Sequence, residues 1–174
     1  MMRLINCTYK KHAVEILDIL NEAIEHSTAL YDYKPRAIDS MVSWFKTKEQ
    51  GCYPVIGAVD GQNKLMGFAS YGSFRNWPAY KYSVEHAVYV HKDHRRKGVA
   101  KFLMQKLLDE AKAQNYHVVI GGIDETNTAS VSMHVKLGFT HCGTIQQAGY
   151  KFGRWLDLAF YQLVLDTPEI PNED

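Results

Sequence analysis

The chain has little cysteine, little proline and almost no net charge, and each shortage excludes a class of protein. Its 174 residues include only 3 cysteines and 5 prolines, and the formal net charge is +1. The thiols of Cys7, Cys52 and Cys142 form no Cys-x-x-Cys pair, which argues against a disulfide framework or a zinc knuckle and favours a reducing compartment. A nearly neutral chain also has no overall field to attract nucleic acid or an anionic membrane.

Long hydrophobic runs are absent as well. The start of the chain, Met1–Asn6, has no apolar core of the kind that a secretion signal needs, and no run approaches the roughly 20 apolar residues that span a bilayer. Hydrophobic residues make up 46% and charged residues 22%, as in an ordinary globular protein. We therefore expect a cytoplasmic protein without nucleic acid or membrane partners, folded as one domain over residues 1–166 with a frayed tail over 167–174.

The spacing of apolar residues predicts helices and strands in a mixed order. Helical periodicity is found over residues 13–26, 38–48, 98–114 and 128–137. Strands are expected at residues 3–9, 54–59, 64–71, 82–90, 118–123, 139–147 and 156–165, with a loop at 149–155. The order β-α-α-β-β-β-α-β-α-β-β indicates an α/β fold, in which a central mixed sheet of about seven strands is flanked by about four helices.

The most informative stretch is Arg95–Ala100, which reads Arg-Arg-Lys-Gly-Val-Ala between a predicted strand and a predicted helix. The first N–H groups of a helix have no intrahelical acceptor and carry the positive end of the helix dipole, so they attract phosphate. Gly98 lets backbone approach a ligand closely, and the cationic side chains add charge. A solvated basic loop is the alternative, and neither a Walker A loop nor a dinucleotide fingerprint is present. We expect a phosphorylated cofactor here.

Two motifs resemble those of the GNAT superfamily of acyl-CoA N-acyltransferases. They are Arg95-x-x-Gly98-x-Ala100 and Asn127-x-x-Ser130-x-x-x-His134-x-x-x-Gly138-Phe139. The runs Val84–His86 and Phe152–Asp157 (Val-Glu-His and Phe-Gly-Arg-Trp-Leu-Asp) resemble the phosphinothricin N-acetyltransferase family, and this likeness extends over nearly the whole chain. It implies the GNAT fold and direct transfer of acetyl from acetyl-CoA, in a ternary complex, to the α-amine of L-phosphinothricin, L-methionine sulfoximine or methionine sulfone.

The resemblance also implies where acetyl-CoA binds, and it implies no metal. The pyrophosphate would lie on the N–H groups of Arg96–Lys101, and the pantetheine arm would pair with Val88–Val90 like an added strand. An N–H such as that of Val88 could polarise the thioester carbonyl. Asn127 would bond the pantetheine arm or cap the following helix. The expected cofactor contacts are Val88, Tyr89, Val90, Arg95, Arg96, Lys97, Gly98, Val99, Ala100, Lys101, Asn127 and Ser130. Family members usually carry Gly where this chain has Arg96.

Two residues are expected to be catalytic. Glu85 is the candidate general base, because an ammonium must lose a proton before the amine can attack. Its alternative is a surface glutamate paired with His86 or Lys81. His134, where the wider superfamily usually has tyrosine, would protonate the departing thiolate or help Glu85 with the substrate proton. Its alternative is a helix-face histidine bonded to a carbonyl group.

The substrate is expected to contact Arg75, Tyr80, Glu85, Tyr31 and Lys151. A guanidinium such as that of Arg75 suits bidentate capture of a carboxylate or phosphinate. Family members are typically homodimers, so a second copy is an expected partner. Two other functions stay open. One is acetylation of another amine, such as a peptide N-terminus, a polyamine or an aminoglycoside, and the other is a non-catalytic sensor that binds acetyl-CoA.

Overall fold

The computed structural model describes residues 2–173 and confirms the predicted order of elements. Four α-helices are present among these residues: α1 (Tyr9–His26), α2 (Ser40–Gln50), α3 (Val99–Ala113) and α4 (Thr128–Lys136). The strands are β1 (Arg3–Asn6), β2 (Val55–Val59), β3 (Leu65–Ser73), β4 (Ser83–Val90), β5 (Val118–Asp124), β6 (Thr140–Lys151) and β7 (Arg154–Val164). Within these residues no helix is both long and apolar enough to cross a membrane.

The strands form a seven-stranded sheet in the order β1-β2-β3-β4-β5-β7-β6. β4 and β5 are parallel, whereas the pairs β1–β2, β2–β3, β5–β7 and β6–β7 are antiparallel. The mixed α/β fold predicted from the sequence is therefore confirmed. The chain divides into two compact units, one made of the chain up to Tyr71 with Ala87–Leu107, the other of Gly72–His86 with the chain from Leu108 onward.

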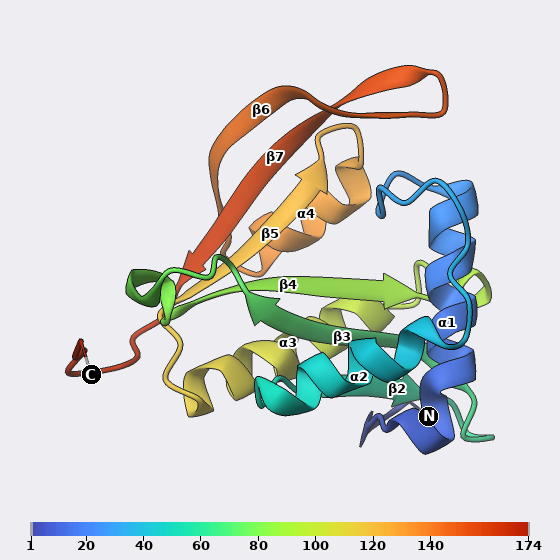
Figure 1. Cartoon of the computed structure of the whole chain (residues 1–174), viewed down its shortest axis with the longest axis horizontal. Coiled ribbons are helices and arrows are strands. Elements are labelled where there is room, and N and C mark those ends of the chain that lie inside the picture. Colours follow the sequence, from blue (N-terminus) through green and yellow to red (C-terminus); the bar gives the residue numbers. More distant parts are fainter. Residues whose placement is uncertain (1, 174) are drawn as a thin grey trace. The chain divides into compact units, whose positions relative to one another are not determined.

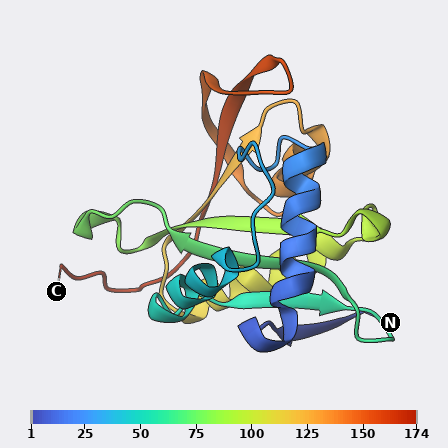
Figure 2. The ribbon, with the colours of Figure 1, turned by 45° about the vertical axis from the view of Figure 1, so that its right-hand side comes forward.

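The first unit has its core between β2, β3 and the first two helices. Figures 1 and 2 show α1 and α2 over one face of these strands and α3 over the opposite face. Ile16 and Leu20 of α1, Met41 of α2 and Phe68 of β3 are at most 2% exposed. Burial of the apolar faces of α1 and α2 against the sheet stabilises these helices more than their intrinsic helix propensity does.

The second unit is built on β5, whose residues Val118–Ile123 are nearly all apolar and lie between β4 and β7. β6 and β7 form a long hairpin that continues past the end of β5 (Figure 1). The expected loop at 149–155 is wrong, because Lys151 pairs with Arg154 across a two-residue turn. Phe152 and Gly153 have φ of 51° and 74°, and a two-residue hairpin turn with both φ values positive matches the twist of its strands.

Candidate active site

The loop before α3 has the backbone shape that a bound phosphate needs. Arg96 and Gly98 both adopt left-handed conformations, with φ of 62° and 79°. The carbonyl of Gly98 accepts the N–H of Phe102 at 3.0 Å, so the helical bonding begins there and the next N–H groups stand at the helix N-terminus. The left-handed φ also explains why glycine is favoured where this chain has Arg96. The loop therefore fits an anion through its backbone.

Two of the three cations in this loop are held by protein groups. Arg95 forms an ion pair with Glu22 of α1, and the Lys97 ammonium donates to the carbonyl of Asp93 at 2.8 Å. All three cationic side chains are exposed. Because Glu22 neutralises part of the charge of Arg95, the backbone N–H groups are the more specific ligands for an anion here. The cationic side chains add a less specific electrostatic attraction.

β4 carries both the expected pantetheine contacts and the expected base. Its pairing with β5 covers Ser83–Glu85 against Val118–Ile120 and goes no further in the described residues. The part of β4 that follows Glu85 and includes Val88 is therefore not paired with β5. The expectation that the pantetheine arm pairs with this part like an added strand requires such unpaired backbone groups. Glu85 precedes Val88 by three residues on this strand.

Glu85 belongs to the second unit and stands over β5. A Cβ on Gly122 would lie 3.2 Å from Oε1 of Glu85, so a larger residue there would disturb the carboxylate. The Glu85 side chain keeps contact with solvent. Partial burial raises the pKa of its carboxyl above the usual range, and the charge of Arg75 lowers that pKa in part. A glutamate with a raised pKa is a better general base near neutral pH.

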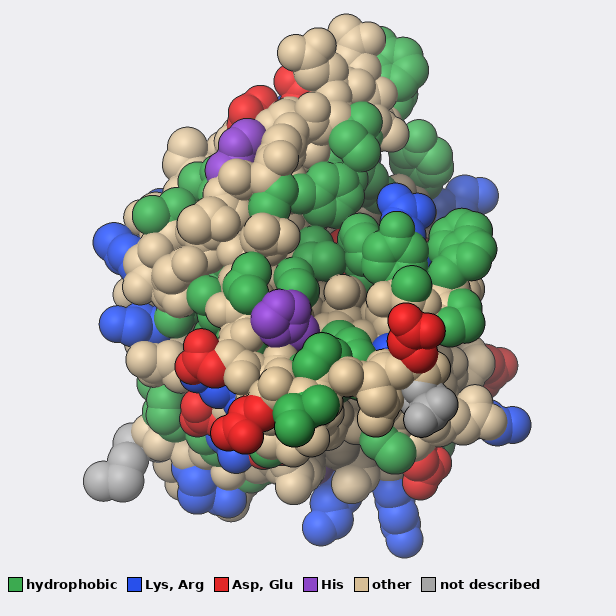
Figure 3. Space-filling view, turned by 90° about the vertical axis from the view of Figure 1, so that its left-hand side faces the viewer, with side chains coloured by type: hydrophobic (Ala, Val, Ile, Leu, Met, Phe, Trp, Pro, Cys, Tyr) green, Lys and Arg blue, Asp and Glu red, His purple; other side chains and the backbone are tan. Residues whose placement is uncertain are grey.

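Arg75 lines a pocket in the segment between β3 and β4. The pocket has a volume of about 440 Å³ and is formed by Phe74, Arg75, Asn76 and Trp77. The Arg75 guanidinium lies 5.2 Å from the centroid of the Phe74 ring, and Tyr80 makes edge contacts with the Phe74 and Trp77 rings. Figure 3 shows hydrophobic side chains exposed on the face that this segment occupies in Figure 1. Arg75, Tyr80 and Glu85 thus belong to one region of the second unit.

Replacing Arg75 by Met is expected to move the acid limb of the pH–rate profile to higher pH. Loss of the guanidinium removes the charge that lowers the pKa of Glu85, so a larger share of Glu85 is protonated and unable to accept a proton. The check is kcat/KM measured across the acid and neutral range. Arg3→Met, which removes a partner of Asn63, is the control. An acid limb that stays in place in Arg75→Met would contradict this electrostatic link.

His134 is buried against His86, which the sequence indicated only as a partner of Glu85. His134 is 1% exposed, and its Nδ1 lies 2.7 Å from the carbonyl oxygen of Ser130. Its Nε2 lies 2.9 Å from Nε2 of His86, and the two rings are stacked with centroids 4.9 Å apart. A Cβ on Gly121 would lie 2.7 Å from Nε2 of His86, so glycine makes room for the pair.

The bonding pattern of this pair assigns its protons. The Ser130 carbonyl can only accept, so Nδ1 of His134 carries a hydrogen and Nε2 of a neutral His134 accepts from Nε2–H of His86. Gly121 and Gly122 are consecutive on β5 and contact the histidine pair and Glu85 respectively, which places these groups on opposite faces of the strand. Direct proton exchange between His134 and Glu85 has no support from this geometry.

We expect ¹⁵N NMR to detect this tautomer pair, with protons on Nδ1 of His134 and on Nε2 of His86. Burial lowers the pKa of His86 to about 3 and also lowers the pKa of His134, so both rings should be neutral at pH 7 and neither should titrate at the ordinary pKa of histidine. Chemical shifts of the four ring nitrogens, followed against pH, are the measurement. Either ring gaining a second proton near pH 6.5, the ordinary value, would contradict the assignment.

The remaining predicted residues lie in several places. Asn127 caps α4 as expected, because its side chain accepts the N–H of Ser130 at 3.2 Å. Tyr31 is 37% exposed in the segment after α1. Lys151 is 4% exposed at the end of β6, with its ammonium 4.9 Å from the centroid of the Phe152 ring. Neither Tyr31 nor Lys151 lines the Arg75 pocket.

Comparison with known proteins decides the family. Residues 14–139 match the acetyltransferase (GNAT) family. The chain belongs to this family. Among curated relatives of this acetyltransferase, an L-methionine sulfoximine/L-methionine sulfone acetyltransferase of Pseudomonas aeruginosa is 42% identical, with 87% of this chain and 88% of the relative covered. A phosphinothricin N-acetyltransferase of Streptomyces coelicolor is 32% identical, with 84% and 87% covered.

Solved structures agree with this GNAT assignment. A protein of Acinetobacter baylyi described as an acetyltransferase has a TM-score of 0.99 and 60% identity, and covers 100% of this chain and 97% of its own. The yncA protein of Salmonella typhimurium, solved with its cofactor acetyl-CoA, has a TM-score of 0.93 and 35% identity, with 99% and 98% covered. The resemblance inferred from the motifs is therefore confirmed. Among residues 2–173 no three potential metal-binding side chains cluster, and the expectation of no metal stays a prediction.

Proposed function

We propose that this GNAT enzyme transfers the acetyl group of acetyl-CoA to the α-amine of phosphinothricin-like amino acids, with methionine sulfone and methionine sulfoximine as the first candidates. The observation that carries the proposal is the Glu85 carboxylate, whose pKa is raised by burial and lowered in part by the charge of Arg75. A base and a cation in one region suit an acceptor with an ammonium and an anionic group. The names of the two curated relatives given above state acceptors of this class.

In this proposal Glu85 removes a proton from the acceptor ammonium, directly or through one water. The neutral amine then forms a nitrogen–carbon bond to the acetyl carbonyl carbon as the carbon–sulfur bond breaks and CoA leaves as its thiolate. The nitrogen loses its second proton as the amide forms, and the thiolate gains one, so the step balances. Acetyl-CoA, when bound, supplies the thioester. An N–H on the unpaired edge of β4, such as that of Val88, would stabilise the negative charge on the carbonyl oxygen. No covalent enzyme intermediate is needed.

The residues of the first unit that would hold acetyl-CoA are those of the loop before α3. The N–H groups from Arg96 to Lys101 fit the pyrophosphate because they stand at a helix N-terminus after the left-handed Gly98. Val88–Val90 would bind the pantetheine arm through backbone groups. In the second unit, the Asn127 side chain accepts the N–H of Ser130 at the start of α4, and both residues stay predicted contacts of acetyl-CoA.

His134 remains the proposed group on the side of the leaving thiolate. In the observed bonding its Nε2 accepts from His86, so it would donate a proton there only after the pair exchanges tautomers. Because both pKa values are lowered, the pair is neutral at physiological pH and would act through hydrogen bonding instead of net charge.

A homodimer, a cytoplasmic location and a role in resistance to toxic amino acids are further parts of the proposal. The β6–β7 hairpin exposes Tyr150, Phe152 and Trp155 by 48%, 57% and 58%, and exposed aromatic clusters are typical of interfaces. Acetylation removes the positive charge of the α-amine, so a target that recognises this ammonium would no longer bind the compound.

The test is release of free thiol from acetyl-CoA by the purified protein. The acceptors are L-methionine sulfone, L-methionine sulfoximine, L-phosphinothricin, a peptide with an N-terminal alanine, and spermidine. We expect turnover with the first three and none with spermidine. Turnover with the peptide alone would replace the amino-acid assignment by N-terminal acetylation. Tight binding of acetyl-CoA with no turnover on any acceptor would support the sensor function instead.

A further inference from the structure

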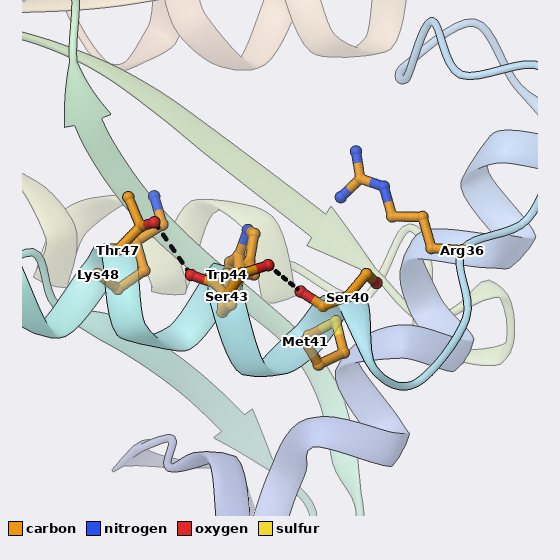
Figure 4. Close-up of a pocket in the computed structure, with 7 residues that line it drawn as sticks. All are labelled: Arg36, Ser40, Met41, Ser43, Trp44, Thr47 and Lys48. Atoms are coloured by element: carbon orange, nitrogen blue, oxygen red, sulfur yellow. Dashed lines mark hydrogen bonds between the residues drawn. The ribbon is translucent and has the colours of Figure 1, made fainter.

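A pocket on α2 has no part in the site described so far. It has a volume of about 330 Å³ and belongs to the first unit. Figure 4 shows that Arg36 comes from the segment before α2, whereas the other side chains come from α2 itself, with Lys48 at the end of the row away from Arg36. This volume is at the lower end of the range for small-molecule sites, so it suits one end of a ligand. The lining residues are Arg36, Ser40, Met41, Ser43, Trp44, Thr47 and Lys48.

Lys48 is a half-buried cation without a counter-ion. Its ammonium donates to the carbonyl oxygen of Tyr71 at 2.7 Å and lies 5.4 Å and 5.8 Å from the ring centroids of Trp44 and Tyr53. Among residues 2–173 no carboxylate pairs with it. Burial lowers the pKa of Lys48 to about 8. Because an unpaired cation is costly to hold away from water, the neutral amine is favoured more here than on an exposed lysine.

The other polar side chains of the pocket do not compete with Lys48 as nucleophiles. Arg36 donates through Nε and Nη2 to both carboxylate oxygens of Asp32. The hydroxyl groups of the pocket donate to backbone carbonyls one turn before them, and a carbonyl group is not a base, so these hydroxyls stay weak nucleophiles. They belong to Ser40, Ser43 and Thr47. The nucleophile of the pocket is therefore the Lys48 amine.

The hydrogen bond to Tyr71 suits Lys48 for acylation. After the ammonium has lost one proton, the nitrogen keeps an N–H for the Tyr71 carbonyl and directs its lone pair elsewhere. An amide formed at this nitrogen also keeps one N–H, so the bond to Tyr71 survives. The amide carries no charge, and the cost of the unpaired cation disappears.

The pocket lies in the same unit as residues predicted to hold the pantetheine arm of acetyl-CoA. The Trp44 ring makes an edge contact with Phe68, and the centroid of the Phe68 ring lies 5.6 Å from that of Tyr89 on β4. Tyr89 is one of the expected cofactor contacts. A source of acetyl thioester is therefore predicted within the unit that contains Lys48.

From these contacts we infer that Lys48 is a self-acetylation site, at which its side-chain amine accepts the acetyl group of acetyl-CoA. The ammonium first loses one proton to solvent. The amine then forms a nitrogen–carbon bond to the acetyl carbonyl carbon as the carbon–sulfur bond breaks. The second proton of the amine passes to the departing thiolate, which gives the free thiol of CoA. The inference goes beyond the proposed function, because neither an amino-acid acceptor nor Glu85 takes part.

The test incubates the purified protein with acetyl-CoA, without any amino acid, and locates acetyl groups by peptide mass spectrometry. At pH 8 a lysine with a pKa of about 8 is about half free amine, whereas an ordinary lysine with a pKa near 10.4 is less than about 1% free amine. Partial burial removes part of this advantage, so we expect acetylation of Lys48 to be at least ~10-fold faster than that of Lys46, an exposed lysine on the same helix. Equal rates at the two lysines, or no acetyl group on Lys48, would overturn the inference.

The pH dependence separates this site from general acetylation of exposed lysines. The charged and titratable side chains that border the pocket or contact Lys48 are Arg36, which is paired with Asp32, and Tyr53. The rate at Lys48 should level off above about pH 8, because its amine is then mostly free. A rate that still rises about tenfold per pH unit between pH 9 and 10, as for an ordinary lysine, would contradict the inference.

Variants and a titration keep the test independent of the proposed function. Lys48→Arg should abolish acetylation at this position and leave that of Lys46 as in the parent. Lys48→Gln, which keeps a donor for the Tyr71 carbonyl, replaces it if Lys48→Arg unfolds at a lower temperature. NMR of side-chain ¹⁵N-labelled lysine should give Lys48 a pKa of about 8 without any acetyl donor, and a pKa near the ordinary 10.4 would overturn the inference. If the wild-type enzyme acetylates no amino acid, the proposed function fails, while acetylation of Lys48 still decides this inference.

Discussion

Replacing Glu85 by Gln is expected to lower kcat at least ~10²-fold, the usual consequence of losing a general base. Glutamine keeps the shape of the side chain, so its contact over Gly122 should survive. It cannot accept a proton, and the acceptor amine is almost entirely protonated at neutral pH. The measurement is steady-state turnover with L-methionine sulfone at saturating acetyl-CoA.

The pH dependence separates catalysis from structure in this variant. The rate of Glu85→Gln should rise with pH as solution hydroxide and the free amine replace the missing base, and the limb assigned to Glu85 should vanish. Glu169→Gln, an exposed glutamate near the C-terminus, is the control and should behave like the parent. Turnover within threefold of the parent would remove Glu85 from this role.

The second large effect is expected at Gly98. Its φ is 79°, and a Cβ there would meet no atom within 4 Å, so an alanine is disfavoured by backbone conformation and not by collision. A left-handed conformation costs an L-residue on the order of 1–2 kcal/mol. If Gly98→Ala escapes this strain by leaving the phosphate-binding shape, the Kd of acetyl-CoA should rise about tenfold, because 1.4 kcal/mol corresponds to a factor of ten.

Gly61 offers a matched control for this test. A Cβ on Gly61 also meets no atom within 4 Å, and its backbone is not left-handed. Gly61→Ala should therefore leave the affinity for acetyl-CoA unchanged. Isothermal titration of both variants is the measurement. Equal affinities in the two variants would mean that the turn at Gly98 does not hold the cofactor.

Local patterns carried much of the prediction. The alternation along β4 separated Glu85 from His86, and Asn127 was recognised as the cap of α4. The hairpin turn was missed because Phe152 has none of the usual Asn-Gly or Asp-Gly chemistry, although its φ is 51°. Next to the turn, Tyr150 and Trp155 pair across the strands with their ring centroids 5.1 Å apart, and this cross-strand contact stabilises it.

Side-chain partners distant along the chain were not predictable in the same way. His86 and His134 are 48 residues apart, and Lys48 is 23 residues from Tyr71. A histidine on the valine face of β4 was the available signal for the first pair, since a buried polar group needs a partner. Nothing in the sequence around Lys48 indicated that its ammonium would be taken out of water.

By itself the sequence determined the order of the helices and strands, the basic turn before α3 and the family of the chain. These depend on periodicity, capping and short motifs, which act within a few residues. Only the tertiary structure decided that His134 is bound to His86, that Glu85 lies on the opposite face of β5, and that Lys48 lines a pocket without a counter-ion. The physical reason is that burial, and with it the pKa of each group, is set by neighbours that folding brings together.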